Sequence, residues 1–273
     1  MKLLAMSAYV CEMFSSAAGG EMRTVQKVKD HQLRDVVTSL DQSLHELAAS
    51  FVETRMPGCK LMSEEGVPIN GLSSLLGKGE WLVVDPLDGT NNYALSMPGF
   101  GFMAAHLVEG KVVGSLVVLP EHDLYFVLEA GEMFVSQPFA PSPAATSGSV
   151  YYAYPPNLSD AALQSRTQLI DLVDRRSSGF YRYGSSCIGL YNLIRGRHMA
   201  FIGHSLRIWD ALAYFPLLEH FGIFFKYHIG GNSLFLVASS NQDFVNEACD
   251  IISLSEKVAF SFYFNNEPLG ISI

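Results

Sequence analysis

Two carboxylates and a hydroxyl lie close together in residues 81–93, which read WLVVDPLDGTNNY. Asp85 and Asp88 supply the carboxylates, and Thr90 supplies the hydroxyl at a position where a helix can begin. Gly89 lets the backbone approach a ligand closely, and amide groups exposed at such a turn suit a phosphate. Hard divalent cations take carboxylate oxygens as ligands, so the segment predicts a metal-assisted phosphate site. The alternative is an ordinary polar turn, because Asp, Pro and Gly are common turn residues.

The segment before these residues is predicted to deliver them as the end of a strand. Residues 81–84 are apolar and partly β-branched, which is typical of a buried strand. Pro86 cannot donate a hydrogen bond to a neighbouring strand, so we expect the strand to stop at Asp85. Glu64 and Asp210 occur in the acidic or polar segments SEEG and RIWD, and with the two aspartates they make a credible Mg²⁺ ligand set.

Five segments, in order and at similar spacing, resemble the inositol monophosphatase family of Mg²⁺-dependent, lithium-sensitive phosphatases. They are residues 35–41 (DVVTSLD), 64–65 (EE), 85–90 (DPLDGT), 184–186 (GSS) and 209–210 (WD). The third matches the family signature Asp-Pro-(Ile/Leu)-Asp-Gly-Thr without a mismatch. The resemblance implies a phosphate monoester hydrolase that uses a metal-activated water and forms no covalent intermediate.

The resemblance also assigns roles to residues. It implies roughly two or three Mg²⁺ ions and no organic cofactor. The implied metal ligands are Glu64, Asp85, the carbonyl of Leu87, Asp88 and Asp210, with Asp85 as the bridge. The implied catalytic residues are Glu64 and Thr90, which orient the water, and Asp41, which supports Thr90. The implied substrate contacts are Asp88, Gly89, Thr90, Gly184, Ser185, Ser186 and Asp210.

The substrate is the least determined part of the interpretation. Family members that act on inositol phosphate carry a glutamate six residues before the Trp-Asp pair, where this chain has Gly203. Residues 91–93, NNY, also differ from the sequence found in relatives that cleave 3′-phosphoadenosine 5′-phosphate. Inositol 1-phosphate is the first candidate, and fructose 1,6-bisphosphate, histidinol phosphate and 3′-phosphoadenosine 5′-phosphate stay open. A non-catalytic regulatory binding protein on the same fold is the alternative from another class.

Composition limits the partners and the compartment. The chain has 273 residues, of which 16% are charged and 49% hydrophobic, as in a compact globular protein. A net charge of −9 argues against nucleic-acid binding, and no segment is long and apolar enough for a membrane span. Four scattered cysteines without a CxxC pair indicate a reducing compartment, so we expect a cytoplasmic protein. The expected partner is a small phosphorylated substrate, and the resemblance implies a homodimer.

Periodicity and turn residues predict a mixed α/β organisation in two halves, residues 1–138 with the metal site and residues 139–273 completing it. Helices are expected at 2–28 and 39–55, followed by an antiparallel meander of strands at 101–108, 111–119, 124–129 and 133–135. Beyond a seam at 138–149, strands near 149–154, 179–183, 199–202 and 233–238 alternate with helices near 159–174, 185–196, 210–221 and 241–253. By resemblance, the fold class is α/β (α+β), a layered α-β-α-β-α sugar-phosphatase sandwich.

Overall fold

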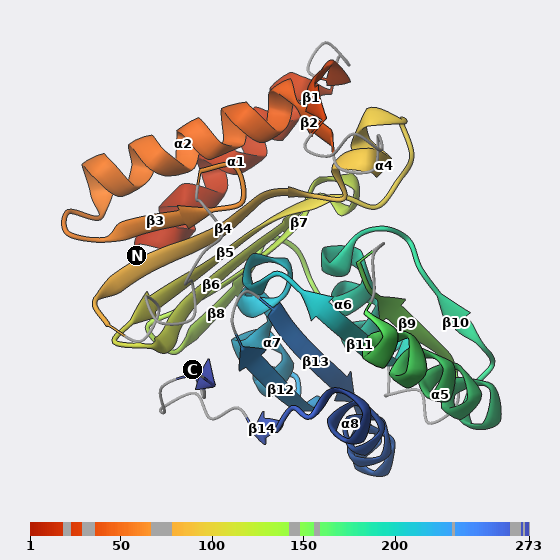
Figure 1. The fold of residues 1–273 in the computed structure, drawn as a ribbon. Helices are drawn as coiled ribbons and strands as arrows, with labels where there is room; N and C mark the ends of the chain where they lie inside the picture. The colour runs from red at the N-terminus through yellow and green to blue at the C-terminus, as the bar shows by residue number, and fades with distance from the viewer. Residues whose placement is uncertain are drawn as a thin grey trace.

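Helices and sheets alternate in five layers in the computed structural model (Figure 1). The structure describes residues 1–18, 23–28, 36–66, 78–141, 148–155, 159–230, 233–262, 269 and 271–272. The helices are α1 (Lys2–Ala17), α2 (Ser39–Arg55), α4 (Thr90–Ala94), α5 (Asp160–Arg176), α6 (Ser186–Ile194), α7 (Phe215–His220) and α8 (Gln242–Glu256), with 3₁₀ turns η2 (Pro120–His122), η3 (Ile208–Asp210) and η4 (Leu212–Tyr214). The expected α-β-α-β-α arrangement is confirmed.

The first sheet has the strand order β3-β4-β5-β6-β7-β8. Its strands are β3 (Lys60–Ser63), β4 (Glu80–Asp88), β5 (Gly101–Val108), β6 (Lys111–Leu119), β7 (Leu124–Glu129) and β8 (Glu132–Val135). β3 runs parallel to β4, and each later pair is antiparallel, which confirms the predicted meander. α1 and α2 cover one face, where Leu3, Leu44 and Phe102 are fully buried.

The second sheet has the order β10-β9-β11-β13-β12-β14, with β15 also paired to β12. Its strands are β9 (Ser149–Ala153), β10 (Phe180–Tyr181), β11 (His198–Leu206), β12 (Phe224–Gly230), β13 (Ser233–Ser239), β14 (Ser261–Phe262) and β15 (Ile271–Ser272). α5 and α8 cover the outer face, and α6 and α7 lie between the two sheets (Figure 1). One apolar core therefore joins the two sheets, because it contains Met103 of β5, Leu190 of α6 and Phe201 of β11.

Several predicted boundaries are wrong. The first helix ends at Ala17 instead of residue 28, and β1 (Val25–Val28), which contains two valines, pairs with β2 (Val36–Thr38) instead. The strand that begins near residue 81 continues through Pro86 to Asp88. The pairing with β5 shifts register between Asp85 and Asp88, so the backbone N–H that Pro86 lacks is not required there.

The helix expected at 210–221 is divided into η3, η4 and α7, and α7 begins beside Pro216, a residue that suits the first turn of a helix. β2, β3 and β12 were not predicted. Asp35, residues 19–20 and residues 142–147 of the expected seam lie outside the described residues. Within the described residues, no helix combines the length and the apolar character needed to cross a membrane.

Candidate functional site

A cavity of 710 Å³ lies where the end of β4 meets the start of α6 and the turn η3. The site residues predicted from the sequence come from several separate segments of the chain. All of them except one line this cavity. The residues brought together are Glu64, Asp85, Leu87, Asp88, Gly89, Thr90, Gly184, Ser185, Ser186 and Asp210. Asp41 is the exception, and it lies behind Thr90 as expected.

The end of β4 is shaped by a turn that only glycine fits. Gly89 has φ +86°, a left-handed conformation that other residues adopt at a cost. A Cβ atom there would also lie 2.5 Å from the carbonyl oxygen of Gly99 and 3.2 Å from Cβ of Ser185. The backbone just before β5 and the residue before α6 can therefore approach the turn closely. α4 begins directly afterwards at Thr90, as predicted.

Asp85 is the most buried acid of the cavity. Its side chain is 1% exposed, and its Oδ1 atom has no hydrogen-bond partner. Burial raises the pKa of Asp85 well above the ordinary value, and the charges of Glu64, Asp88 and Asp210 raise it further. A buried carboxylate oxygen without a partner costs free energy, and a cation would satisfy it.

Asp88 is held by the N-terminus of α6. Its Oδ2 accepts hydrogen bonds from Oγ of Ser185 at 2.5 Å and from the backbone N of Cys187 at 2.6 Å, and its Oδ1 accepts one from N of Ser186 at 3.3 Å. Burial raises the pKa of Asp88 to about 6, although these three hydrogen bonds act to lower it. The predicted loop 184–186 therefore contacts a predicted metal ligand directly.

Thr90 is fixed from behind by Asp41. Its Oγ1 lies 2.8 Å from Oδ1 of Asp41 and 2.8 Å from the carbonyl oxygen of Leu87. Asp41 is 2% exposed and also accepts a hydrogen bond from the backbone N of Thr38 at 2.8 Å, which caps α2. Burial raises the pKa of Asp41 to about 6 against the lowering effect of its bonds to Thr38 and Thr90. One residue thus serves both as a helix cap and as the support of Thr90.

The donor set suits a hard divalent cation such as Mg²⁺, because every predicted ligand offers oxygen and Asp85 has an unsatisfied buried acceptor. The acids are nevertheless not drawn tightly together. Among the described residues, the only group of three or more His, Cys, Asp or Glu ligand atoms lying within 4.8 Å of one another is found elsewhere, at Cys59, Glu80 and His106.

The opposite wall of the cavity is formed by an irregular part of β11. The register of β11 against β13 shifts between Gly203 and Leu206, and Ser205 between them has φ +56°. This irregularity brings Ser205, Leu206 and Arg207 to the cavity surface. The backbone N of Arg207 then donates a hydrogen bond of 2.9 Å to Oδ2 of Asp210. Burial and nearby acids raise the pKa of Asp210, while its contact with Arg207 lowers it.

Packing requires glycine at position 203. A Cβ atom would lie 2.6 Å from Cδ1 of Leu206 and 2.9 Å from Cε1 of Phe201, and both side chains are buried. We expect Gly203→Ala to lower the free energy of unfolding by about 1–3 kcal/mol, as overpacking does in other cores. Urea denaturation measures the loss. Adding Leu206→Ala should recover part of it, and an unchanged stability of the single variant would contradict the packing argument.

Two residues that organise the site were not predicted from the sequence. Tyr151 is buried in β9, and its hydroxyl donates to the carbonyl of Ser185 at 2.8 Å and accepts from N of Ser185 at 3.1 Å. Asn92 donates to the carbonyls of Gly99 at 2.7 Å and Tyr183 at 2.8 Å. A buried tyrosine in a strand resembles any core aromatic residue, so no sequence signal distinguishes Tyr151.

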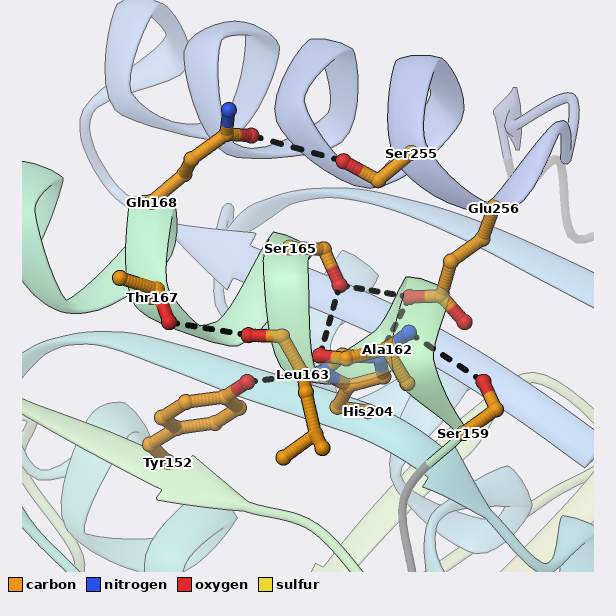
Figure 2. Close-up of polar contacts among 10 residues, drawn as sticks. All are labelled: Tyr152, Ser159, Ala162, Leu163, Ser165, Thr167, Gln168, His204, Ser255 and Glu256. Carbon is orange, nitrogen blue, oxygen red and sulfur yellow. Dashed lines mark hydrogen bonds and ion pairs between the residues drawn. The ribbon is translucent and has the colours of Figure 1, made fainter.

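A buried polar network lies behind the β11 wall (Figure 2). His204 is fully buried, and its Nδ1 is 2.7 Å from the hydroxyl of Tyr152 while its Nε2 is 2.5 Å from Oε1 of Glu256. Ser165 of α5 donates to the same Glu256 oxygen at 2.8 Å. Burial acts to raise the pKa of Glu256, but its hydrogen bonds with His204 and Ser165 lower it overall. The network ties α5 and α8 to β9 and β11.

The fold and the sequence together identify the family. A sequence model of the inositol monophosphatase family matches residues 3–250. The chain belongs to the inositol monophosphatase family. An inositol-1-monophosphatase of Rhizobium meliloti is 28% identical over 193 residues, which are 69% of this chain and 70% of the relative. A Nus factor SuhB of Pseudomonas aeruginosa is 24% identical over 216 residues, or 74% and 76% of the two chains.

Solved structures of the family have the same fold. The structure of the extragenic suppressor protein SuhB from Bartonella henselae superposes with a TM-score of 0.73 at 21% sequence identity, covering 92% of this chain and 98% of that one. At this sequence identity, the structural similarity shows that the two proteins share the layered fold. The sequence model that matches residues 3–250 confirms the family resemblance carried by the signature around Asp85 and Asp88.

Proposed function

We propose that this family member is a Mg²⁺-dependent phosphatase that hydrolyses a small polyol or sugar phosphate, with inositol 1-phosphate as the first candidate. The observation that carries the proposal is the unsatisfied Oδ1 of Asp85 inside a cavity lined by three further acids. The inositol-1-monophosphatase of Rhizobium meliloti, a 28% identical relative, supports the choice of substrate class. Fructose 1,6-bisphosphate, histidinol phosphate and 3′-phosphoadenosine 5′-phosphate are the other substrates to test.

The proposed ligands are Glu64, Asp85, the carbonyl of Leu87, Asp88 and Asp210. When bound there, Mg²⁺ supplies an activated water and charge stabilisation for an in-line displacement at phosphorus. The residues of the chain do the rest. Thr90 and Glu64 orient the water, with the hydroxyl of Thr90 held 2.8 Å from Asp41. The turn at Gly89 receives the phosphate, and Ser185 positions Asp88 through their 2.5 Å hydrogen bond.

The geometry also supports a direction for the proton. Asp41 has a pKa raised to about 6 and is screened from solvent, so it can share a proton with the Thr90 hydroxyl near neutral pH. Thr90 in turn lines the cavity and can accept a hydrogen bond from the attacking water. In this proposal Asp41 acts through Thr90 and does not touch the substrate.

The direct test is phosphate release from a panel of inositol, fructose, histidinol and adenosine phosphates, with and without Mg²⁺ and with added Li⁺. We expect release that requires Mg²⁺ and is suppressed by Li⁺, with the highest kcat/KM on a monophosphate of a small polyol. Calorimetric titration with Mg²⁺ separates the outcomes. If Mg²⁺ binds but no phosphate is released from any compound of the panel, the proposed substrates are wrong. If Mg²⁺ does not bind, the proposed ligand set is wrong.

A non-catalytic regulatory role is the second candidate, and one observation favours it. Relatives named Nus factor SuhB match this chain over most of its length. The two roles respond differently to Asp88→Asn, since an enzyme loses turnover whereas binding to a partner does not require this carboxylate.

A homodimer in the cytoplasm is part of the main proposal, supported by the family relationship and by four cysteines that form no disulfide. Size-exclusion chromatography with light scattering tests the dimer.

A further inference from the structure

A second group of metal-ligating side chains lies on the first sheet, away from the cavity. Cys59, Glu80 and His106 offer a sulfur, a carboxylate oxygen and a ring nitrogen that all lie within 4.8 Å of one another. Glu80 begins β4 and Asp88 ends it, so a rise of about 3.3 Å per residue separates the two places by roughly 25 Å along the strand. The group is therefore independent of the acids proposed to hold Mg²⁺.

Strand register explains why these three residues meet. Lys60 of β3 pairs with Trp81 of β4 in parallel, which places Cys59 beside Glu80. Leu82 pairs with His106 of β5, and Glu80 lies two residues before Leu82, so Glu80 and His106 share one face of the sheet. Backbone hydrogen bonds of three adjacent strands thus fix the separation of the ligands, which limits the reorganisation that binding requires.

The contacts already present are those of a partly assembled site. Nε2 of His106 is 2.8 Å from Oε1 of Glu80, and His106 is only 13% exposed. Nζ of Lys2 lies 3.9 Å from the same Glu80 oxygen and compensates its charge from a side chain that is 45% exposed. The thiol of Cys59 makes a long contact of 3.7 Å with the carbonyl of Lys60 and a hydrogen bond with the backbone of Leu82. Bonds of about 2.0–2.3 Å in tetrahedral geometry bring ligand atoms to roughly 3.5 Å, so small side-chain rotations suffice.

We propose that Cys59, Glu80 and His106 form a binding site for a borderline-soft divalent cation, Zn²⁺ in the first instance, with a fourth position left to water. A thiolate and an imidazole favour Zn²⁺ over Mg²⁺, which takes oxygen ligands. The bound cation replaces the ammonium group of Lys2 as the partner of Glu80. It joins the loop after α2 to β4 and β5, so Zn²⁺ raises the melting temperature of the protein.

Co²⁺ is the most selective probe, because a thiolate ligand adds an intense charge-transfer absorption that an all-oxygen site cannot produce. We expect one Co²⁺ per chain with this absorption when the protein is titrated in the presence of excess Mg²⁺, and displacement of the Co²⁺ by Zn²⁺. Cys59→Ser should remove the absorption and weaken Zn²⁺ binding by about a hundredfold or more. Cys11→Ser is the matched control, since Cys11 is also a half-buried free thiol, and it should leave both unchanged.

Two further variants keep the test decisive if Cys59→Ser folds poorly. His106→Gln should weaken Zn²⁺ binding while leaving the thiol in place, and Lys2→Gln should leave the binding intact or strengthen it, because a competing positive charge is removed. Zn²⁺ should also protect Cys59, and not Cys11, from alkylation by iodoacetamide. A charge-transfer absorption that survives Cys59→Ser, or Zn²⁺ affinity that is unchanged in His106→Gln, would overturn the proposal.

Discussion

Asp85→Asn is expected to reduce Mg²⁺-dependent phosphate release by about a thousandfold or more. Asp85 is the proposed bridging ligand, and metal stabilisation of the transition state is worth several kcal/mol, where about 4 kcal/mol corresponds to that factor. An amide keeps the shape of the side chain and loses its charge. Steady-state rates on the best substrate of the panel measure the effect, with Mg²⁺ titrated for each variant.

The same variant is expected to stabilise the metal-free protein at pH 8. Asp85 is buried, and the surrounding acids repel its charge. An asparagine removes this repulsion, and its amide group can donate to a neighbouring carboxylate. Thermal melting in EDTA should therefore give a higher melting temperature for Asp85→Asn than for the wild type. Added Mg²⁺ should raise the melting temperature of the wild type and leave that of the variant nearly unchanged.

The pH dependence follows from the raised pKa values. Asp88 and Asp41 have folded pKa values of about 6, above the ordinary aspartate value, so between about pH 4 and pH 6 the folded state holds more protons than the unfolded state. The contribution of these two groups to stability is therefore present at low pH and is lost as the pH rises through about 6. Without metal, their contribution favours the folded state more at pH 5 than at pH 8.

Asp171→Asn provides the matched control for Asp85→Asn. Asp171 is a 68% exposed carboxylate on α5, paired with Arg175 on the surface. Its conversion to an amide should change neither the phosphatase rate nor the metal-free melting temperature by a measurable amount. If Asp85→Asn retained near-normal activity, the assignment of the metal site to the end of β4 would be wrong.

The local sequence around the site was sufficient to predict what the end of β4 presents. The turn at Gly89, the start of a helix at Thr90 and the support of Thr90 by Asp41 can each be predicted from residue types and the family resemblance, and the structure has all three. The helix predicted at 39–55 coincides with α2, because its apolar positions repeat at helical spacing and Thr38 caps it. Short-range patterns of this kind depend on local chemistry alone.

Features set by long-range pairing could not be predicted. The continuation of β4 through Pro86 depends on a register shift against β5, which no local pattern reveals. The division of residues 210–221 into short turns depends on the packing of this segment between the two sheets, where Leu212 and Tyr214 are fully buried. The significance of Gly203 likewise appears only when Leu206 is seen to occupy the space of a side chain.

His204→Leu is expected to lower the free energy of unfolding by about 2–4 kcal/mol, because His204 links two layers of the fold through its hydrogen bonds. Leucine leaves the hydroxyl of Tyr152 without its 2.7 Å partner and removes the ring from Glu256. Both groups are nearly inaccessible to water, since Tyr152 is 1% exposed and the Glu256 side chain is 11% exposed. Each buried polar group without a partner costs about 1–3 kcal/mol, which sets the magnitude. Urea denaturation measures it.

The coupling between His204 and Glu256 is measured by a double-mutant cycle with Glu256→Leu. We expect the sum of the losses in unfolding free energy of the two single variants to exceed the loss of the double variant by about 1.5–3 kcal/mol. This is the range for a hydrogen bond to a charged group. Glu256→Gln is the informative control. The lowered pKa of Glu256 keeps its side chain a carboxylate, which accepts a hydrogen bond from Nε2 of His204. An uncharged amide oxygen can take the place of the carboxylate, and the loss should stay below about 1 kcal/mol.

The activity of these variants tests whether the network also supports the site. His204 directly precedes Ser205 and Leu206, which line the cavity, and the backbone of Arg207 then holds Asp210. Loss of the network should let this wall of the cavity relax, so that kcat/KM falls in His204→Leu at temperatures well below its melting transition. Glu256→Gln should retain activity, because it preserves the hydrogen bonds. If His204→Leu lost stability but kept full activity, β11 would hold Asp210 in place without help from α5 and α8.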